Sequence, residues 1–241
     1  MMAHVEKAQR ATALITGASG GIGAAIARRL GSEGYDLALV ARGEERLKST
    51  ATSLRDAGIS GGLILPCDVA DPEAVHRMIE EVMGHFGRID VLVNSAGTSR
   101  AGFFLRTRLD EWNEILRINL TGVMLTTQAV LRPMRRQRSG TIVTIASLGG
   151  RQGRETLSTY CASKFGVVGL MDTVRREVER LGIRVTTILP GEVDTAMHQD
   201  GPERGERRMR PEDVAEAVSF SLRLGPRAVL RELVLHNPDS E

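Results

Sequence analysis

Two residues four positions apart, Tyr160 and Lys164, form the pair in this chain whose types and spacing point most directly to chemistry. The chain has only 2 tyrosines, and arginine supplies most of its 32 basic residues. Residues four apart on a helix share one face, so an ammonium would lie beside a phenol. A nearby cation favours the phenolate, which predicts a lowered tyrosine pKa and a group that exchanges protons near neutral pH. The alternative is an exposed lysine beside a tyrosine that packs in the core.

A glycine-rich turn follows the first apolar run of the chain, and an Ala- and Ile-rich stretch with helical periodicity comes after it. Glycines at a strand-to-helix junction let the backbone approach a pyrophosphate, which the free N–H groups and dipole of the helix N-terminus stabilise. The turn therefore predicts dinucleotide binding. The residues expected to contact the cofactor there are Gly17, Ser19, Gly20, Gly21, Ile22 and Gly23.

The same turn admits a second interpretation, because residues 17–21 also fit the Gly-x-Ser-x-Gly pattern of a serine nucleophile. His236, late in the chain, would then be the base. Such a turn normally follows several strands, whereas one apolar run precedes it here, so dinucleotide binding is favoured. A P-loop is excluded, because no Lys followed by Ser or Thr comes after the glycines.

Arg42, which follows the second predicted strand, bears on the choice of dinucleotide. An NAD site needs an acidic residue about 20 positions beyond the glycines, where it binds the ribose 2′-hydroxyl. No carboxylate stands at the tip of this strand, and a guanidinium suits a 2′-phosphate. The sequence therefore favours NADP(H), with NAD(H) as the second choice. Asp68, after the third predicted strand, either holds the adenine amino group or caps the next helix.

These residues need a scaffold, and the chain alternates short apolar runs with longer amphipathic stretches, as in a parallel sheet covered on both faces. Right-handed crossovers would give a Rossmann-like α/β fold, a doubly wound parallel sheet of about seven strands with helices on both faces. No linker divides the chain, so residues 1–241 are expected to form a single dinucleotide-binding and catalytic domain. The predicted strands are 12–16, 37–40, 63–66, 91–94, 141–146, 184–189 and 233–235. The predicted helices are 22–33, 44–57, 72–86, 110–137, 159–181 and 211–224.

The composition argues against several classes of function. A net charge of +2 and the lack of a long basic block give no reason to expect nucleic acid. The 2 cysteines and 5 histidines show no metal-ligand spacing, so no metal is predicted, and so few cysteines suggest a reduced compartment. No apolar run approaches ~20 residues and residues 1–10 lack an apolar core, so no membrane span or signal peptide is expected. We therefore expect a cytoplasmic enzyme or binding protein.

Together with several further motifs, these features resemble the short-chain dehydrogenase/reductase family over nearly the whole chain. The family's Asn-Asn-Ala-Gly segment has one substitution here, Ser95 in place of the second asparagine. The intervals between the four catalytic residues match those of the family. The matching segments are the glycine turn at 16–23, residues 94–97, Asn119, Ser147, Tyr160 with Lys164, and Pro190-Gly191 followed by Thr195.

The resemblance implies a role for each catalytic residue. Tyr160 would protonate the carbonyl oxygen, and Lys164 would lower the Tyr160 pKa and bind the nicotinamide ribose. Ser147 would hydrogen-bond the substrate oxygen, and Asn119 would hold a water that links Lys164 to solvent. Alternatively, Ser147 only caps a strand end and Asn119 is a buried polar partner. Beyond the glycine turn, the expected cofactor contacts are Arg42, Asp68, Val69, Asn94, Ala96, Gly97, Tyr160, Lys164, Pro190, Gly191, Val193 and Thr195.

Two segments bear on the substrate. Fatty-acid-synthesis ketoreductases of this family end in a glycine-rich segment that residues 231–238 lack, so the ending resembles the branch of broad carbonyl or hydroxy-acid dehydrogenases. Residues 195–210 correspond to the family's substrate lid and are rich in arginine. Such a lid either attracts a carboxylate or phosphate group of the substrate, or is a mobile segment without specificity. Glu192 faces either the nicotinamide pocket or the substrate. The resemblance also implies a homodimer or homotetramer, paired through the predicted helices 110–137 and 159–181.

The predicted function is hydride transfer between NADP(H) and a ketone or secondary alcohol, as in a carbonyl reductase that acts on a small molecule. The alternatives are an NAD-dependent alcohol or hydroxy-acid dehydrogenase, a 3-oxoacyl reductase, and a non-catalytic dinucleotide-binding module. A serine hydrolase would instead be revealed by reaction of Ser19 with a fluorophosphonate probe.

Overall fold

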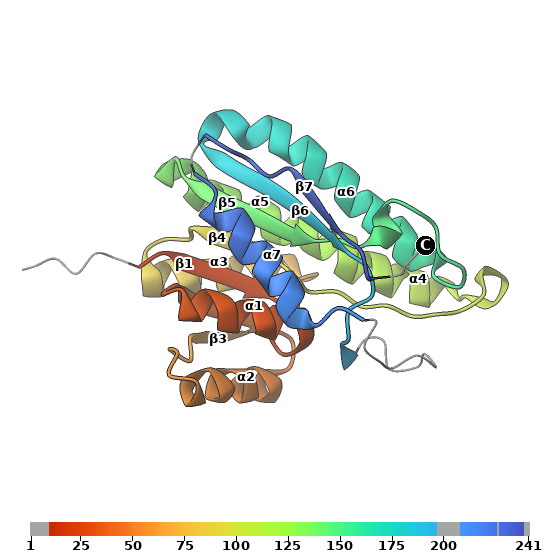
Figure 1. Ribbon diagram of the computed structural model, residues 1–241, viewed down its shortest axis with the longest axis horizontal. Coiled ribbons are helices and arrows are strands. Elements are labelled where there is room, and N and C mark those ends of the chain that lie inside the picture. The colour runs from red at the N-terminus through yellow and green to blue at the C-terminus, as the bar shows by residue number, and fades with distance from the viewer. Residues whose placement is uncertain (1–9, 197–207, 226, 239–241) are drawn as a thin grey trace, which may run out of the picture.

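The chain folds around one sheet of seven parallel strands (Figure 1). The structure is a computed structural model and describes residues 10–196, 208–225 and 227–238. The strand order is β3-β2-β1-β4-β5-β6-β7, which confirms the predicted doubly wound α/β fold. The strands are β1 (Thr12–Thr16), β2 (Asp36–Ala41), β3 (Leu63–Pro66), β4 (Val91–Asn94), β5 (Gly140–Ile145), β6 (Ile183–Pro190) and β7 (Glu232–Leu235).

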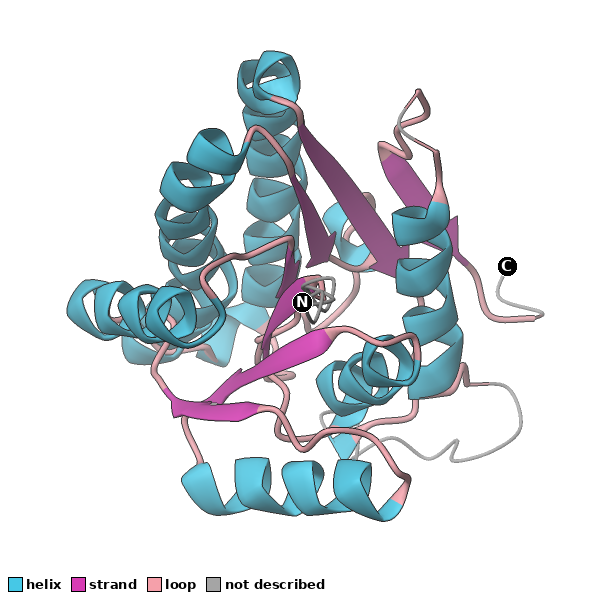
Figure 2. Ribbon diagram, turned by 90° about the vertical axis from the view of Figure 1, so that its left-hand side faces the viewer, coloured by secondary structure: helices cyan, strands magenta, loops and turns pink. Residues whose placement is uncertain are grey.

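Helices cover both faces of the sheet (Figure 2), and each face has its own core of buried side chains. Helices α1, α2 and α7 pack on one face, and α3, α5 and α6 pack on the other. Successive strand residues point to opposite faces, so Ile15 and Leu39 join the first core while Leu14 and Ala38 join the second. The longer helices are α1 (Gly21–Ser32), α2 (Glu44–Asp56), α3 (Pro72–Phe86), α4 (Leu109–Leu116), α5 (Gly122–Gln137), α6 (Ser158–Val178) and α7 (Pro211–Arg223). Short helical turns are η1 (Phe104–Arg106), η2 (Arg117–Thr121), η3 (Leu148–Gly150) and η4 (Glu179–Leu181).

The direction in which strands are added to the sheet reverses between β1 and β4. Ile15 of β1 lies opposite Leu39 of β2 on one side and opposite Val93 of β4 on the other. In open α/β sheets, ligands bind in the crevice outside the carboxyl ends of the strands at such a switch point. The glycine turn directly follows β1, so the topology places it at the mouth of this crevice.

The predicted helix 110–137 forms, but its hydrogen-bonding pattern changes in the middle. Residues 110–137 form α4, a π-helical turn (η2, Arg117–Thr121) and α5 instead of one α-helix. A π-turn widens the helix locally and often occurs at a functional site. Asn119 lies in this turn, and its side chain bonds outside the helix to the backbone of Thr98. The apolar periodicity alone does not reveal this interruption.

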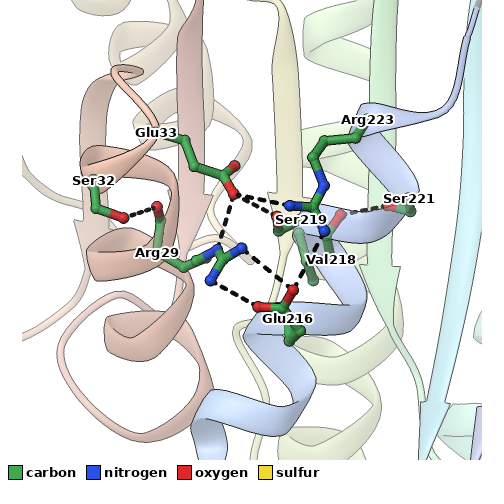
Figure 3. Close-up of polar contacts among 8 residues, drawn as sticks. All are labelled: Arg29, Ser32, Glu33, Glu216, Val218, Ser219, Ser221 and Arg223. Carbon is green, nitrogen blue, oxygen red and sulfur yellow. Dashed lines mark hydrogen bonds and ion pairs between the residues drawn. The ribbon is translucent and has the colours of Figure 1, made fainter.

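A polar network joins α1 to α7 (Figure 3). Arg29 of α1 pairs with Glu33 at 2.9 Å and with Glu216 of α7 at 2.7 Å. The buried Ser219 hydroxyl donates to Glu33 at 2.6 Å, and Arg223 pairs with Glu216 at 3.3 Å. The network therefore links the two helices on the face of the sheet that both cover.

Two classes of site are absent from the described parts of the chain. None of its helices is long and apolar enough to cross a membrane. No group of three or more His, Cys, Asp or Glu side chains there could hold a metal ion.

Candidate active site

Tyr160 and Lys164 lie in the first two turns of α6, where the predicted spacing puts them side by side. The Lys164 Nζ atom is 5.7 Å from the centroid of the Tyr160 ring. Lys164 is buried, and its ammonium donates a hydrogen bond of 3.0 Å to the carbonyl oxygen of Ile145, the last residue of β5. The strand end thus holds the amine beside the tyrosine ring.

The electrostatics of this pair differ from the sequence-based prediction. Burial raises the pKa of the Tyr160 phenol above its ordinary value of 10.0, while a hydrogen bond with Ser147 and the charge of Arg154 oppose the rise. The predicted lowering by Lys164 is therefore wrong, because desolvation disfavours the phenolate more than its surroundings favour it. Burial also lowers the pKa of Lys164 to about 8. At neutral pH the pair is a protonated phenol beside an ammonium.

The titration of Lys164 gives the first testable prediction. A lysine whose pKa is depressed by burial destabilises the fold fully below its folded pKa, and the penalty disappears as pH rises to its unfolded value near 10.5. Lys164→Met removes this penalty. Its free energy of unfolding relative to wild type should therefore be highest below pH 8 and should fall by about 3 kcal/mol between pH 8 and 10.5.

Urea unfolding of both proteins across this pH range measures the difference. Lys48→Met is the matched control, because Lys48 is exposed, paired with Glu44 and Glu45, and has a raised pKa. Its stability relative to wild type should show no such fall. If the difference in free energy of unfolding between Lys164→Met and wild type does not change with pH, the lowered pKa of Lys164 is contradicted.

Ser147 follows β5 and starts the short turn η3. Its hydroxyl accepts a hydrogen bond of 3.0 Å from the backbone N–H of Gly149 and is also bonded to Tyr160. A side chain at Gly149 would meet Ser147 Oγ and the Tyr160 ring, each at 3.4 Å, so both groups close around this glycine. The structure therefore brings the predicted serine and tyrosine together on one side of the crevice.

Asn119 is fully buried in the π-turn. Its amide donates to the Thr98 carbonyl at 2.9 Å and to Ser163 Oγ at 3.1 Å, and its Oδ1 accepts from the Thr98 N–H at 2.8 Å. Both amide hydrogens are therefore used within the protein. The arrangement matches the alternative of a buried polar partner, which fixes Thr98 beside the cavity, and the predicted water relay stays a prediction.

The turn after β1 is packed tightly enough to require glycine at positions 17 and 23. Gly17 has a φ of +71°, and a side chain there would come within 2.8 Å of the Ala96 backbone. A side chain at Gly23 would collide with the Gly17 carbonyl, whereas one at Gly20 would meet open space. Thr16 Oγ1 accepts the Ser95 and Ala96 N–H groups at 3.1 Å each, which ties residues 95–97 to the turn.

One cavity of about 260 Å³ joins the glycine turn to the catalytic residues. Among the described residues that line it, Arg46 and Lys164 are the only charged side chains. The predicted site residues that line it are Gly17, Ser19, Gly20, Gly21, Ile22, Gly23, Gly97, Ser147, Tyr160, Lys164, Pro190, Gly191, Val193 and Thr195. The lining residues that the sequence analysis missed are Arg46, Ser95, Thr98, Ile145, Ala146 and Ala196.

A cradle of backbone at a helix N-terminus, next to a cavity whose described lining residues include no carboxylate, fits a dinucleotide. The N-terminus of α1 directs its unpaired N–H groups toward this space, since Gly20 has no side chain that caps the helix. The glycines remove the side chains that would fill the cradle. The residues present therefore suit the pyrophosphate of the predicted cofactor.

Arg42 and Asp68 belong to an ion-pair network outside this cavity. Arg117 pairs with Asp68 at 2.9 Å and with Glu114 at 3.0 Å, and Glu114 lies 3.6 Å from Arg42. Asp68 Oδ1 also accepts the N–H of Ala70 at 3.0 Å. The Asp68 carboxylate is thus already occupied by Arg117, a partner that sequence position alone does not reveal.

Three other predicted contact residues are mainly structural. Asn94 is buried at the end of β4, donates to Thr127 and Thr144 at 3.1 and 3.3 Å, and accepts from Thr126 at 2.7 Å. Val69 is buried in the second core, and Ala96 packs against that core. None of the three lines the cavity, so their proposed contacts with a cofactor stay predictions.

The segment predicted as a lid, 195–210, lies largely outside the described residues, which omit 197–207. Its described ends meet, because Met209 forms a parallel bridge with Val193. The Met209 N–H donates to the Glu192 carbonyl at 3.0 Å, and the Met209 carbonyl accepts from the Asp194 N–H at 2.8 Å. The base of this segment therefore adjoins the catalytic end of the cavity.

The alternative of a serine nucleophile finds no support in the geometry. Ser19 lies in the glycine turn and lines the cavity, but no hydrogen bond joins it to a histidine within the described residues. His236 follows β7 and is not among the residues that line the cavity. A nucleophile needs a base within hydrogen-bond reach, which Ser19 lacks in this part of the chain.

Comparison with known proteins agrees with this site. The family model described as short chain dehydrogenase matches residues 11–205. A putative ketoacyl reductase from Streptomyces coelicolor is 37% identical and covers 90% of this chain and 92% of its own length. An uncharacterized oxidoreductase from Staphylococcus epidermidis is 34% identical, with the same coverage of 90% and 92%.

Two solved structures share the fold closely. A variant of actinorhodin polyketide ketoreductase, determined with NADPH, has a TM-score of 0.88 at 35% identity and covers 94% of this chain and 96% of its own. An alcohol dehydrogenase from the archaeon Thermococcus sibiricus, complexed with 5-hydroxy-NADP, has a TM-score of 0.88 at 31% identity, with coverage of 96% and 98%. The chain therefore belongs to the short-chain dehydrogenase/reductase family and is an oxidoreductase of that family.

Proposed function

We propose that this protein is an NADP(H)-dependent carbonyl reductase, which interconverts a ketone and a secondary alcohol. The observation that carries the proposal is the meeting of Ser147, Tyr160 and Lys164 in the same cavity as the glycine turn. The related structures solved with NADPH and 5-hydroxy-NADP support the cofactor. The putative ketoacyl reductase and the polyketide ketoreductase support the direction of reduction.

Mechanistically, the bound nicotinamide would supply the hydride. Tyr160 would donate a proton from its phenol to the carbonyl oxygen, and burial favours this protonated state because it raises the phenol pKa. Ser147 would donate a hydrogen bond to the same oxygen and stabilise its developing negative charge. Lys164, held by Ile145, would keep a positive charge beside the tyrosine and bind the nicotinamide ribose.

The adenosine end of the cavity has a second arginine that the sequence analysis missed. Arg46, in the first turn of α2, lines the cavity beside Ser19, and its guanidinium makes no hydrogen bond or ion pair within the described residues. Arg42 is 62% exposed and faces Glu114 at 3.6 Å. We propose that both guanidiniums bind the 2′-phosphate of NADP(H), since neither is tightly committed to a carboxylate.

This assignment predicts a change in cofactor preference. Arg42→Ala and Arg46→Ala should each weaken NADPH binding about tenfold, because each removes a charge-assisted hydrogen bond to phosphate. NADH lacks that phosphate, so its dissociation constant should change less than about twofold. Titration calorimetry with both cofactors measures the effect. Arg55→Ala, in the last turn of α2, is the control, and equal losses for NADPH and NADH would refute the assignment.

The reaction itself is tested with purified wild-type protein, NADPH and a panel of ketones, oxo acids and 3-oxoacyl thioesters. Loss of NADPH absorbance with formation of the matching alcohol is the expected result. If no member of the panel is reduced and no secondary alcohol is oxidised with NADP⁺, the proposed function is wrong and a non-catalytic dinucleotide-binding module becomes the better description. Tight NADPH binding without turnover would identify that module.

Three further features are proposed on the family resemblance. The chain forms one domain across residues 1–241, acts in the cytoplasm, and assembles as a homodimer or homotetramer. Size-exclusion chromatography with light scattering distinguishes these two assemblies from a monomer of 26.2 kDa.

A further inference from the structure

A carboxylate of the protein faces one of the two arginines that would bind the 2′-phosphate of NADP(H). Glu114, on α4, lies 3.6 Å from Arg42, measured from carboxylate Oε1 to guanidinium Nη1. Both side chains are about half exposed, so this contact is a weak ion pair that a more highly charged anion can displace. Arg42 is thus held, but not tightly, by an acidic group of the same chain.

Arg117, at the start of η2, fixes the position of Glu114. Its guanidinium donates two hydrogen bonds to the Glu114 carboxylate, from Nε to Oε2 at 3.0 Å and from Nη2 to Oε1 at 3.3 Å. A third bond runs from Nη1 to Oδ2 of Asp68 at 2.9 Å. Positive and negative charges therefore alternate along Arg42, Glu114, Arg117 and Asp68, which we call the Arg42 network.

The backbone brings the Arg42 network to the edge of the sheet where the glycine turn lies. Arg42 follows β2 and Asp68 follows β3, which are neighbours in the sheet, and the glycine turn follows β1 on the same edge. Arg46, which lines the cavity, has its Nε atom 3.6 Å from the place that a side chain at Gly43 would take. Its guanidinium therefore lies over the residue next to Arg42. A phosphate bound by Arg46 would also come close to Arg42 and so to Glu114.

Glu114 opposes such a phosphate in two ways. A phosphate that binds Arg42 must first displace the carboxylate, which lowers the apparent affinity. The displaced carboxylate then stays near the phosphate, and like charges repel. NADH carries a hydroxyl in place of the phosphate and meets neither effect. Two other acidic residues near Arg42 in sequence, Glu44 and Glu45, are paired with Lys48.

We propose that Glu114 sets the strength of the preference for NADP(H) by competing with the 2′-phosphate for Arg42, and that Arg117 limits this competition. The inference rests on the proposed NADP(H) dependence and names the residues that tune it. Arg117 acts as a positioning residue, because it neutralises Glu114 and orients it while Asp68 anchors the far side of its guanidinium. A weaker or stronger hold of Arg117 on Glu114 would change the affinity for NADPH and leave that for NADH nearly constant.

The test uses Glu114→Gln, which keeps the size of the side chain and removes its charge. At low ionic strength its dissociation constant for NADPH should fall about two- to fivefold, the range of an exposed ion pair, and that for NADH should change less than about 1.5-fold. Arg117→Gln should act in the opposite direction and weaken NADPH binding about two- to fivefold more than NADH binding, because Glu114 then keeps only Arg42 as a partner. Titration calorimetry measures all four constants. High salt should shrink both effects, since the groups are exposed.

Glu179→Gln is the matched control. Glu179 is an exposed carboxylate paired with Arg175 at 3.7 Å, and it comes just before β6, at the opposite edge of the sheet. Its replacement makes the same change in net charge and should leave both dissociation constants unchanged. In a protein that already carries Arg42→Ala, Glu114→Gln should have no effect on NADPH binding, because the competition needs the arginine.

Unchanged or weaker NADPH binding in Glu114→Gln would overturn the inference and leave the proposed reductase standing. Equal gains for NADPH and NADH, or the same gain with and without Arg42, would do so as well. If Arg42→Ala weakens the binding of both cofactors equally, the proposed cofactor assignment fails first and this inference with it. Should Arg117→Gln not fold, Glu114→Gln and its control decide alone.

Discussion

Replacing Tyr160 with Phe is expected to lower kcat for carbonyl reduction about 100- to 10,000-fold, the range that general acid catalysis supplies. The substitution removes only the phenol oxygen. The ring that packs beside Lys164, whose amine lies 5.7 Å from its centroid, is retained. The loss should fall on kcat more than on KM for NADPH, because the proton moves in the transition state.

Steady-state kinetics with the best carbonyl of the panel measures this effect. The dissociation constant for NADPH and the thermal midpoint should stay close to the wild-type values, which shows that the fold and cofactor site survive. A variant that reduces the carbonyl within a few-fold of wild type would show that another group donates the proton, and Tyr160 would then be a packing residue.

The second large effect is expected from Ser147→Ala, which should lower kcat about 100- to 1,000-fold. The Ser147 hydroxyl is bonded to Tyr160 and lies beside the cavity, so it would donate to the carbonyl oxygen as negative charge develops. Loss of this bond raises the energy of the transition state more than that of the bound ketone.

The control must separate catalysis from local structure, because Ser147 also accepts the N–H of Gly149 at 3.0 Å. Ser32→Ala removes a hydroxyl that bonds the Arg29 carbonyl at 2.7 Å (Figure 3), and neither residue lines the cavity. It should leave kcat unchanged. If Ser147→Ala loses less than about tenfold while Tyr160→Phe is inactive, the serine is a turn cap and not a catalytic residue.

Much of the fold follows from the sequence, because seven apolar runs separated by amphipathic ones leave few alternatives to a doubly wound sheet. The π-helical segment inside residues 110–137 could not be predicted. The π-turn there depends on the bonds of Asn119 to Thr98 and Ser163, which lie outside the predicted helix. Such a tertiary contact overrides helical periodicity and leaves no local signal.

The catalytic constellation could be predicted because its motifs have fixed spacings, but its electrostatics could not. Lys164 is visible in the sequence beside Tyr160, whereas the burial that raises the tyrosine pKa and lowers that of the lysine depends on the packing of α6 against β5. The same holds for the Ile145 carbonyl, which takes the ammonium hydrogen bond.

Charged residues around the cavity were the hardest to assign. Asp68 and Arg42 are conspicuous in the sequence. In the structure, however, Asp68 forms an ion pair with Arg117, and Arg42 faces the carboxylate of Glu114. Arg46 lines the cavity although its helical position marks it as an ordinary surface residue. Arg46 stands in the first turn of α2, so a search for basic residues in that turn would have found it.

The central claim is direct hydride transfer from NADPH to a carbonyl carbon, with the proton supplied by the protein. NADPH carrying deuterium at both C4 positions of the nicotinamide tests it most directly. With the best substrate of the panel, mass spectrometry and NMR of the product should show one deuterium on the carbinol carbon for each cofactor consumed. A product without deuterium at that carbon, or cofactor oxidation without an alcohol product, would contradict the account.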